Sequence, residues 1–413
     1  YTLSKNSYKI ILDNHFLWEV KEINMKISDS VKYVGVNDHE IDLFEGQFEV
    51  PLGMAYNSYV IIDDKIAVMD SVDQNFGDEW LKNIDGVLEG KTPDYLIVQH
   101  MEMDHSANVL SFMQKFPEAK IAASKMAFTM MKNMFGTDFA DRQIVIAEGS
   151  KIELGKHTLN FITAPNVHWP EVIMTYESSE KILFSADAFG KFGANDKEDP
   201  EGWACEARRY YFGIVGKFGS SVQALLKKAS NLEIQKICSL HGPVLDSDIK
   251  TYIDYYNTWS SYEAETEGVF IAYTSVYGNT KQAAEKLAEL LKAKGCPKVT
   301  IADLAREDTY ECVEDAFRYS KLVLATTTYC GGIFPKMREF ISHLTERNFQ
   351  KRTVALIENG SWAPSAVKGM TAMLEPLQDI KIIDEKVTIK IAVNDETVRQ
   401  LEFLAEKLSD SLK

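Results

Sequence analysis

The sequence predicts an α/β protein made of two domains, and three observations support this. The chain has 413 residues, more than one hydrophobic core usually serves, and its composition is globular, with 45% hydrophobic and 26% charged residues. Residues 25–262 carry many short apolar runs typical of strands. Residues 268–413 alternate between apolar runs and amphipathic segments, which predicts a parallel sheet covered on both faces by helices.

The segment before the first domain, residues 1–24, fits neither pattern. The chain begins with Tyr1, and Met25 in "MKISDSVKYVGV" is a more natural start. We therefore expect residues 1–24 to be an N-terminal extension or a remnant of an expression vector.

The first domain, residues 25–262, is expected to be dominated by strands. In "YNSYVIIDDKIAVMDSV" two β-runs flank a turn at Asp63 and Asp64, residues that favour turns. Further strands are predicted within 94–100, 119–124, 143–148, 157–164, 172–178, 181–187 and 235–242. Helices are predicted between several of them, around 106–116 and 222–230.

The second domain, residues 268–413, follows a polar, Glu-rich segment that ends at Gly268. Strands are predicted at 269–275, 299–304, 321–329, 353–360 and 380–390. Helices are predicted at 280–294, near 335–347 and from Glu396 to the end. This βαβ alternation is typical of a doubly wound sheet.

Charge, hydropathy and cysteine usage exclude several functional classes. A formal net charge of −16 argues against nucleic-acid binding, which needs basic surfaces. No apolar run reaches the roughly 18 to 20 residues that span a bilayer, and no signal peptide is recognisable. The 5 cysteines are scattered without a C-x-x-C pair, which is typical of free thiols in a reducing compartment. We expect a soluble, cytoplasmic protein that binds neither nucleic acid nor membrane.

Four potential metal ligands stand together in "QHMEMDHS": His100, Glu102, Asp104 and His105. If the preceding strand continues through His100, residues 100 and 102 face the same side and converge on one ion. Asp104 and His105 would then lie at the entry to a helix that begins near Ser106, and their side chains would turn toward a second metal ion. Taken alone, the motif is more simply explained as a polar loop with a helix-capping Asp.

Three further candidates follow or precede apolar strand runs elsewhere in the first domain. His168 stands in the loop of "APNVHWPEVIMTY", Asp187 ends "KILFSAD", and His241 ends "QKICSLH". Residues at strand ends gather where active-site loops lie. A carboxylate such as Asp187 is able to bridge two ions, so the seven side chains suffice for two coordination spheres.

This order of motifs resembles the metallo-β-lactamase-like domain of flavodiiron proteins, also called A-type flavoproteins, and implies an αββα sandwich. The resemblance implies that His100, Glu102 and His168 bind one iron, that Asp104, His105 and His241 bind the other, and that Asp187 bridges them. Zinc hydrolases of the same superfamily usually carry His where this chain has Glu102. A carboxylate makes the site more anionic, which favours iron, although zinc also binds carboxylates.

Three other residues are candidates for the substrate pocket. The segment "ARRYYFGIV" resembles the family segment that provides a pocket Tyr, so Tyr210 or Tyr211 is predicted to hydrogen-bond a bound diatomic molecule. A buried core Tyr is nearly as good an interpretation. His39, in "VNDHEIDLF", is a weaker candidate for a pocket or supporting residue.

The second domain carries a candidate phosphate-binding loop in "AYTSVYGNTKQAAEKL". Hydroxyl side chains, backbone N–H groups and the N-terminus of the following helix suit one phosphate, and therefore a mononucleotide. Neither G-x-x-x-x-G-K-[ST] nor G-x-G-x-x-G is present. Two more loops, "ATTTYCGGIFPKM" and "IENGSWAPSA", follow strands of the same sheet and should converge with the first.

Together these loops resemble flavodoxin and imply FMN as the cofactor. The implied contacts are Thr274, Ser275, Val276, Tyr277, Gly278, Asn279, Thr280, Thr327, Thr328, Tyr329, Cys330, Gly331, Gly332, Asn359, Gly360, Ser361, Trp362 and Ala363. Among them Trp362 is the best candidate to stack on the flavin ring. The alternative for Trp362 is an ordinary surface aromatic.

The resemblance covers nearly the whole chain and implies a flavodiiron oxidoreductase that reduces O2 to water, NO to N2O, or both. Two iron ions and FMN are the expected cofactors. We expect a head-to-tail homodimer, or a dimer of such dimers, and a separate electron donor such as rubredoxin or an NADH-linked reductase. No rubredoxin or reductase module is expected within the chain. The alternatives are a zinc hydrolase with a fused flavodoxin-like module and a flavodoxin-type carrier whose first domain is only structural.

Overall fold

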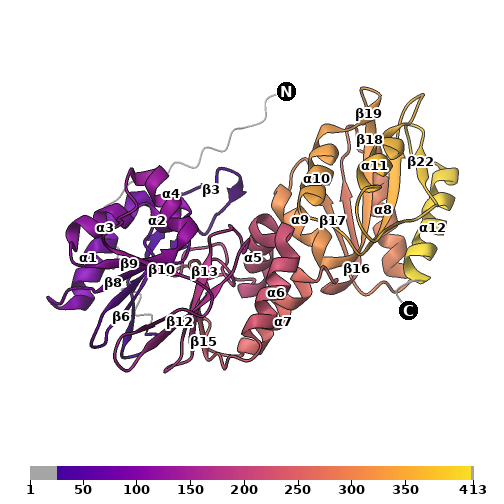
Figure 1. Cartoon of the computed structure of the whole chain (residues 1–413). Coiled ribbons are helices and arrows are strands. Elements are labelled where there is room, and N and C mark those ends of the chain that lie inside the picture. The colour runs from indigo at the N-terminus through magenta and orange to yellow at the C-terminus, as the bar shows by residue number, and fades with distance from the viewer. Residues whose placement is uncertain (1–25, 411–413) are drawn as a thin grey trace, which may run out of the picture.

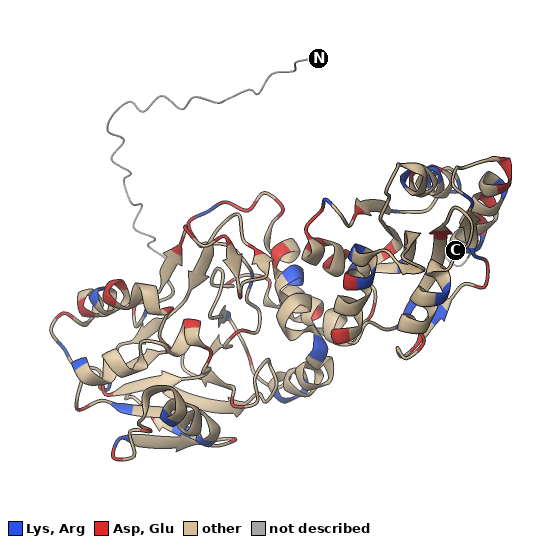
Figure 2. Cartoon of the chain, turned by 90° about the horizontal axis from the view of Figure 1, so that it is seen from above, with Lys and Arg blue, Asp and Glu red and all other residues tan. Residues whose placement is uncertain are grey.

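The computed structural model describes residues 26–410, and the extension predicted for residues 1–24 lies outside them. Two lobes follow one another along the chain (Figure 1). The N-terminal lobe runs through α7 (Ile249–Ser260), and the C-terminal lobe starts with β16 (Thr266–Tyr273). Acidic and basic residues are interspersed along both lobes (Figure 2). No described helix is long and apolar enough to cross a bilayer.

The N-terminal lobe is an αββα sandwich built on two sheets. The first sheet has the order β1 (Val31–Tyr33), β6 (Tyr59–Ile61), β7 (Ala67–Met69), β8 (Tyr95–Val98), β9 (Lys120–Ser124) and β10 (Gln143–Ile146). The second has the order β11 (Lys151–Glu153), β12 (Thr158–Thr163), β13 (Ile173–Glu177), β14 (Ile182–Phe184) and β15 (Lys236–Cys238). The predicted hairpin around Asp63 and Asp64 is present as the antiparallel pair β6 and β7.

Three apolar layers hold this lobe together. An inner layer between the two sheets includes Tyr59, Phe161 and Phe184. The outer face of the first sheet is covered by α1 (Gly77–Leu88), α3 (Val109–Lys115) and α4 (Lys125–Phe135). The outer face of the second sheet is covered by α6 (Gly219–Ala229) and α7. Burial of these apolar faces is the main driving force for the sandwich.

A small hairpin of β3 (Leu43–Phe44) and β4 (Phe48–Glu49) lies beside the first sheet, inside the loop between β2 (Val36–Asp38) and β5 (Met54–Tyr56). After the second sheet's β14, the chain forms α5 (Trp203–Tyr210), a π-helical turn (Tyr211–Val215) and a 3-10 turn (Gly216–Phe218). The 3-10 turn leads into α6, whereas α5 and the π-helical turn contact the C-terminal lobe.

The C-terminal lobe is a doubly wound sheet with the strand order β17 (Val299–Asp303), β16, β18 (Tyr319–Tyr329), β20 (Arg352–Asn359) and β21 (Ile380–Ile382). The pairings along this path are parallel, as the alternation predicted, and β22 (Val387–Ile389) also pairs parallel with β20. Numbered along the chain this order is 2-1-3-4-5, which is the flavodoxin-like topology. A short antiparallel strand, β19 (Gly332–Ile333), pairs with the end of β18.

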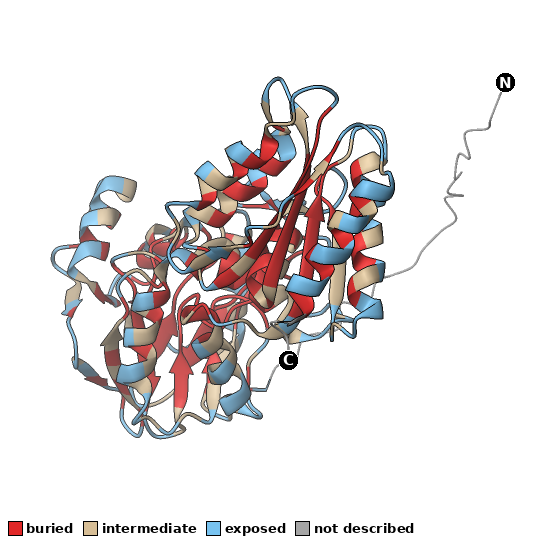
Figure 3. Ribbon diagram, turned by 90° about the vertical axis from the view of Figure 1, so that its right-hand side faces the viewer, coloured by how far each residue is buried: buried red, intermediate tan, exposed pale blue. Residues whose placement is uncertain are grey.

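Helices cover both faces of this sheet, and its strands are buried between them (Figure 3). On one face lie α8 (Asn279–Ala293) and α12 (Asp395–Asp410). On the other lie α9 (Thr309–Arg318), α10 (Pro335–Glu346) and α11 (Ala366–Leu374). The two lobes meet at α9, where the rings of Phe212 and Phe317 stack with centroids 4.2 Å apart.

Ion pairs of two buried arginines reinforce that contact. The guanidinium of Arg208 donates to both carboxylate oxygens of Glu265 at 2.7 Å and to Glu314 at 2.9 Å. Arg209 pairs with Glu311 at 3.2 Å. Glu311 and Glu314 also lie close to Cys205, a grouping that could hold a metal ion. Because both carboxylates already pair with these arginines, we assign no metal to it.

Candidate metal centre and flavin-binding loops

The seven predicted metal ligands lie together at one edge of the sandwich, although two local details differ from the prediction. The strand ends at Val98 and not at His100, because the Asp70 carboxylate accepts the Gln99 N–H at 2.6 Å in place of a neighbouring strand. The following helix begins earlier than predicted, at Met103 in α2 (Met103–Ser106). His100 and Glu102 therefore converge from a loop and not from one face of a strand.

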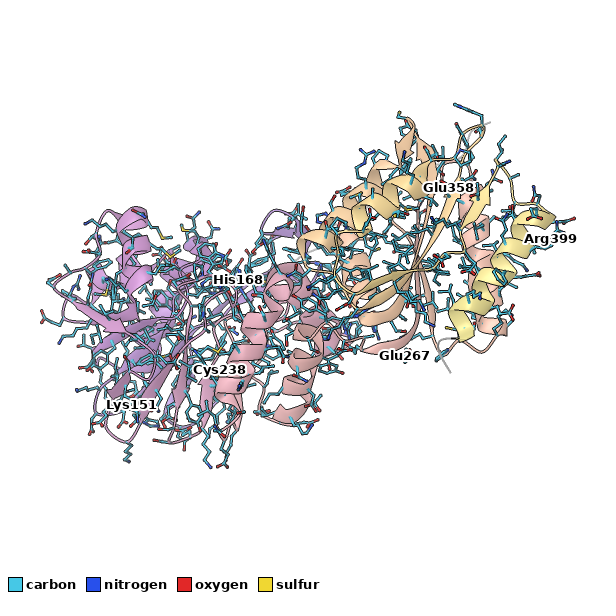
Figure 4. The ribbon with its side chains drawn as sticks, turned by 45° about the vertical axis from the view of Figure 1, so that its right-hand side comes forward. Lys151, His168, Cys238, Glu267, Glu358 and Arg399 are labelled. Atoms are coloured by element: carbon cyan, nitrogen blue, oxygen red, sulfur yellow. The ribbon has the colours of Figure 1, made fainter. Side chains whose placement is uncertain are left out.

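Four side chains form the first ligand group: His100, Glu102, His168 and Asp187. The His168 Nε2 lies 2.9 Å from Glu102 Oε2 and 3.1 Å from Asp187 Oδ2. The His100 Nε2 lies 3.2 Å and 3.1 Å from the same two oxygens. His168, labelled in Figure 4, enters from the loop before β13, as predicted.

The second group consists of Asp104, His105 and His241, joined by the other oxygen of Asp187. The His105 Nε2 lies 3.2 Å from Asp104 Oδ2, 3.2 Å from Asp187 Oδ1 and 3.0 Å from the His241 Nε2. The His241 Nε2 lies 3.3 Å from Asp104 Oδ2. Asp187 thus presents one oxygen to each group, which is the geometry of a bridging carboxylate.

The spacing of these atoms fits bound cations. Ligands at about 2.1 Å from one ion are separated from each other by about 3.0 Å at right angles and about 3.4 Å in a tetrahedron. Two imidazole nitrogens facing each other at 3.0 Å, as in His105 and His241, gain little without an ion or a proton between them. Both Asp104 oxygens and Asp187 Oδ1 are buried without a hydrogen-bond partner, a costly arrangement that a cation relieves.

The raised pKa values of two ligand histidines also indicate that carboxylates make this centre strongly negative. Burial opposes the charged form of His168, but the hydrogen bonds that the imidazole donates to Asp187 and Glu102 outweigh burial and raise the pKa of His168 to about 9. For His105, burial is likewise outweighed, by Asp104 and then Asp187, and its pKa rises to about 10. These imidazoles must lose protons to bind a metal, so metal binding and protonation compete.

Supporting residues fix the orientation of two histidines. The His100 Nδ1 lies 2.8 Å from Glu171 Oε1, and both side chains are buried. The His241 Nδ1 donates to the Ala55 carbonyl at 2.7 Å, which leaves its Nε2 free to coordinate. The sequence interpretation missed Glu171, although it stands three residues after His168 in "HWPE".

The structure separates the three pocket candidates. The buried Tyr210 lies beside His241, with ring centroids 5.5 Å apart. Tyr211 packs instead in the core, with its ring centroid 5.1 Å from that of Tyr256. This agrees with the alternative interpretation of a buried core Tyr. His39 lies at the surface with its Nε2 3.1 Å from Asp196, and it belongs to neither ligand group.

Two residues of the small hairpin border the centre and carried no signal in the sequence. The Phe44 ring meets the His241 ring edge to face at 5.4 Å. Glu45, at the tip of the hairpin, is exposed as a residue. Partial burial of its carboxyl group and the nearby charge of Glu102 raise the pKa of Glu45 to about 7. Only the tertiary structure brings this hairpin to the metal ligands.

The three predicted flavin loops converge at the carboxyl ends of their strands. The Thr280 and Thr327 hydroxyls lie 3.2 Å apart, and the Asn359 amide reaches Thr280 at 3.5 Å. The Thr328 hydroxyl accepts the backbone N–H of Ser365 at 2.9 Å, which ties the second loop to the third. Glu358, labelled in Figure 4, accepts the Val367 N–H at 2.8 Å below that loop.

The loop residues suit a bound mononucleotide. Gly278 caps α8 at a positive φ of 89°, and no side chain caps this helix, so its first N–H groups are available to a phosphate. Tyr277 and Trp362 are each 92% exposed, and Tyr329 is 49% exposed. Single exposed aromatic rings are common, but these three stand on loops that converge, and exposed apolar patches mark ligand or partner sites.

Replacing Trp362 tests the flavin site. We expect Trp362→Ala to weaken FMN binding by about 10-fold, because loss of an aromatic stack costs about 1 kcal/mol beyond buried area. Iron content should not change. Titration of the apoprotein with FMN, followed by flavin fluorescence, measures the effect. Phe403→Ala, at an exposed position on α12, is the control, and unaltered FMN affinity in Trp362→Ala would contradict the assignment.

Each lobe matches a known protein family. A model described as ODP family beta lactamase matches residues 54–242, and a model described as flavodoxin domain matches residues 270–379. The chain is 33% identical to a putative diflavin flavoprotein A 1 of Nostoc, over 73% of this chain and 53% of that protein. It therefore spans about half the length of that relative.

Other relatives match over nearly their whole length. A nitric oxide reductase of Moorella thermoacetica is 27% identical, over 93% of this chain and 97% of that protein. Rubredoxin oxygen:oxidoreductase from Desulfovibrio gigas superposes with a TM-score of 0.87 at 23% identity, covering 94% of this chain and 98% of the other. The flavodiiron protein from Giardia intestinalis superposes with a TM-score of 0.86 at 24% identity, covering 94% and 96%. With a beta-lactamase-like domain followed by a flavodoxin domain, the chain has the two-domain fold of the flavodiiron proteins.

Proposed function

We propose that this protein reduces O2 to water, NO to N2O, or both, at a diiron centre that receives electrons from FMN. The observation that carries the proposal is the placement of Asp187, whose two oxygens face two separate ligand groups. The same chain carries the flavodoxin domain. A relative named nitric oxide reductase and a structural neighbour named rubredoxin oxygen:oxidoreductase support the two substrates.

The chain's own residues prepare the centre. When bound, the iron pair and FMN together supply the electrons that reduce the diatomic substrate. Glu171 and the Ala55 carbonyl hold His100 and His241 in the tautomers that coordination needs. Tyr210, beside His241, is the candidate to donate a hydrogen bond to the substrate.

Glu102 distinguishes this proposal from a zinc hydrolase. It lies within 3.2 Å of both first-group imidazoles, so the first group contains two carboxylates and two imidazoles. Oxygen-rich, anionic sites stabilise ferric iron, whereas the hydrolase chemistry of this fold needs no flavin. The convergent flavin loops therefore favour the redox function.

The assembly and the electron source are also part of the proposal. The FMN loops and the metal ligands belong to different lobes: β19 is part of the second flavin loop in one lobe, and α2 carries Asp104 and His105 in the other (Figure 1). A head-to-tail dimer brings the FMN of one chain to the metals of its partner. Electrons would then come from a separate donor such as rubredoxin. The proposed domain boundaries are 25–262 and 268–413.

Anaerobic reduction followed by exposure to each gas tests the function. We expect purified protein to contain two iron ions and one FMN per chain, and the reduced protein to be reoxidised rapidly by O2, NO or both. Stopped-flow absorbance of the flavin follows reoxidation, while an oxygen electrode and N2O analysis identify the products. A colourless, zinc-loaded protein that hydrolyses a thioester or lactam would overturn the proposal.

A further inference from the structure

The hairpin formed by β3 and β4 stands between the metal centre and the C-terminal lobe. On the metal side, the Phe44 ring contacts His241 at 5.4 Å and Phe192 at 5.8 Å between centroids. Glu45, at the tip, lies within electrostatic reach of Glu102. The hairpin therefore forms one wall of the space beside the metal ligands.

The hairpin also contacts Tyr310, a residue of α9 in the C-terminal lobe, through Phe48, the cross-strand partner of Phe44. The Tyr310 hydroxyl donates to Gln47 Oε1 at 2.5 Å, and the Gln47 amide donates to Glu45 Oε2 at 3.1 Å. The Tyr310 ring also packs on Phe48, with centroids 4.3 Å apart. A continuous set of contacts thus runs from the flavodoxin-like lobe to the tip of the hairpin.

Tyr310 is itself firmly placed. The Asp308 side chain caps α9 and accepts the Tyr310 N–H at 2.7 Å. The Arg347 guanidinium lies 5.2 Å from the centre of the Tyr310 ring, and the His343 ring lies at the same distance. His343 lies in α10 and Arg347 follows it, both in the same lobe as Tyr310. Tyr310 is therefore fixed to the flavin-binding lobe.

The hairpin has little structure of its own to hold it. Its strands have 2 residues each, and such a short pair is marginal in water. Glu45 has φ of 50° at the turn, where an L-residue other than Gly is strained. Gly46 beside it, with φ of 69°, accepts this conformation freely. Contacts from outside must therefore fix where the tip lies.

We propose that Tyr310 is a positioning residue for the metal pocket of its own chain. Through Phe48 and Gln47 it holds the hairpin so that Phe44 stays against His241 and Glu45 stays at the open side of the centre. The flavodoxin-like lobe of a chain then shapes the site at which that chain binds its substrate. This inference rests on the proposed diiron function.

Tyr310→Phe tests the inference, because it keeps the ring on Phe48 and removes only the hydroxyl. We expect the affinity of the oxidised centre for azide, and kcat/KM for the diatomic substrate, each to change by about 3- to 10-fold, the size of one lost hydrogen bond. Iron content, FMN content and the rate of FMN reduction should stay unchanged. Azide titration by visible absorption reads the pocket without turnover.

Two further variants separate positioning from general stability. Gln47→Met should change azide affinity and kcat/KM as much as Tyr310→Phe does. The double variant Tyr310→Phe with Gln47→Met should show no further change, since each substitution removes the same Tyr310–Gln47 hydrogen bond. Tyr319→Phe is the matched control, because the hydroxyl of Tyr319 bonds that of Thr300, at 2.6 Å, inside the C-terminal lobe. Unchanged azide affinity and kcat/KM in an iron-loaded Tyr310→Phe protein, or an equal change in Tyr319→Phe, would overturn the inference. Wild-type protein without iron would overturn the proposed function instead.

Discussion

Asp187→Asn should abolish turnover and lower iron content in both metal positions. In the wild-type chain the two carboxylate oxygens face opposite ligand groups at 3.1–3.2 Å. An amide keeps the shape but has no negative charge and presents its NH2 group to one of the two ions. We expect activity to fall by more than about 100-fold, beyond the roughly 10- to 100-fold typical of a lost supporting partner. Iron quantification on desalted protein and oxygen-electrode assays measure the two effects.

Asp63→Asn provides the matched control for this substitution. Asp63 is a carboxylate of the same lobe that also contacts a histidine, with its Oδ2 2.7 Å from His157 Nδ1. It lies outside both ligand groups. Hydrogen bonds from His157 outweigh burial and hold the pKa of Asp63 near 2, so its charge stabilises the fold and the substitution should lower Tm. Full iron content in Asp187→Asn, or equal iron loss in both variants, would contradict the bridging role.

The ligand types could be predicted from the sequence because each stands next to a strand run that the hydropathy pattern reveals. His168, Asp187 and His241 were predicted from this position alone, and the structure brings all three to one centre. The exact ends of the elements could not be predicted. The β8 ladder stops early because the side chain of Asp70, 29 residues away, takes the Gln99 N–H. No local pattern encodes such a contact.

The same reasoning explains which pocket residues were missed. Phe44 and Glu45 reach the centre only because the hairpin folds across from the start of the lobe. Phe has no coordinating group, and Glu45 is one of 61 acidic residues with no ligand motif around it, so neither stood out in the sequence. For the adjacent Tyr210 and Tyr211, the sequence left the choice open. One helical residue turns the side chain by about 100°, so one ring faces His241 and the other faces the core around Tyr256. Because α5 passes into a π-helical turn between these two residues, the sequence pattern did not predict which ring would face the metal ligands.

Mixed dimers should show whether electrons pass between chains. One variant is metal-deficient, Asp187→Asn, and the other is FMN-deficient, Ser275→Asp with Asn279→Asp, which places negative charge where the phosphate is predicted to bind. In a head-to-tail dimer that pairs these two chains, the intact FMN faces the intact metal centre. We expect about half of wild-type activity, although each parent homodimer is inactive. Co-expression with two affinity tags isolates the mixed species.

A second mixed dimer reverses the expectation and serves as the control. When all three substitutions are on one chain and the partner is wild type, each intact cofactor faces a damaged one across the interface. This dimer should be nearly inactive if electrons cross between chains, and half active if they stay within one. Because the two mixed dimers contain the same substitutions in equal number, differences in folding or loading cannot produce the contrast. Activity in the second and none in the first would show that each chain reduces its own metals, and the head-to-tail proposal would be wrong.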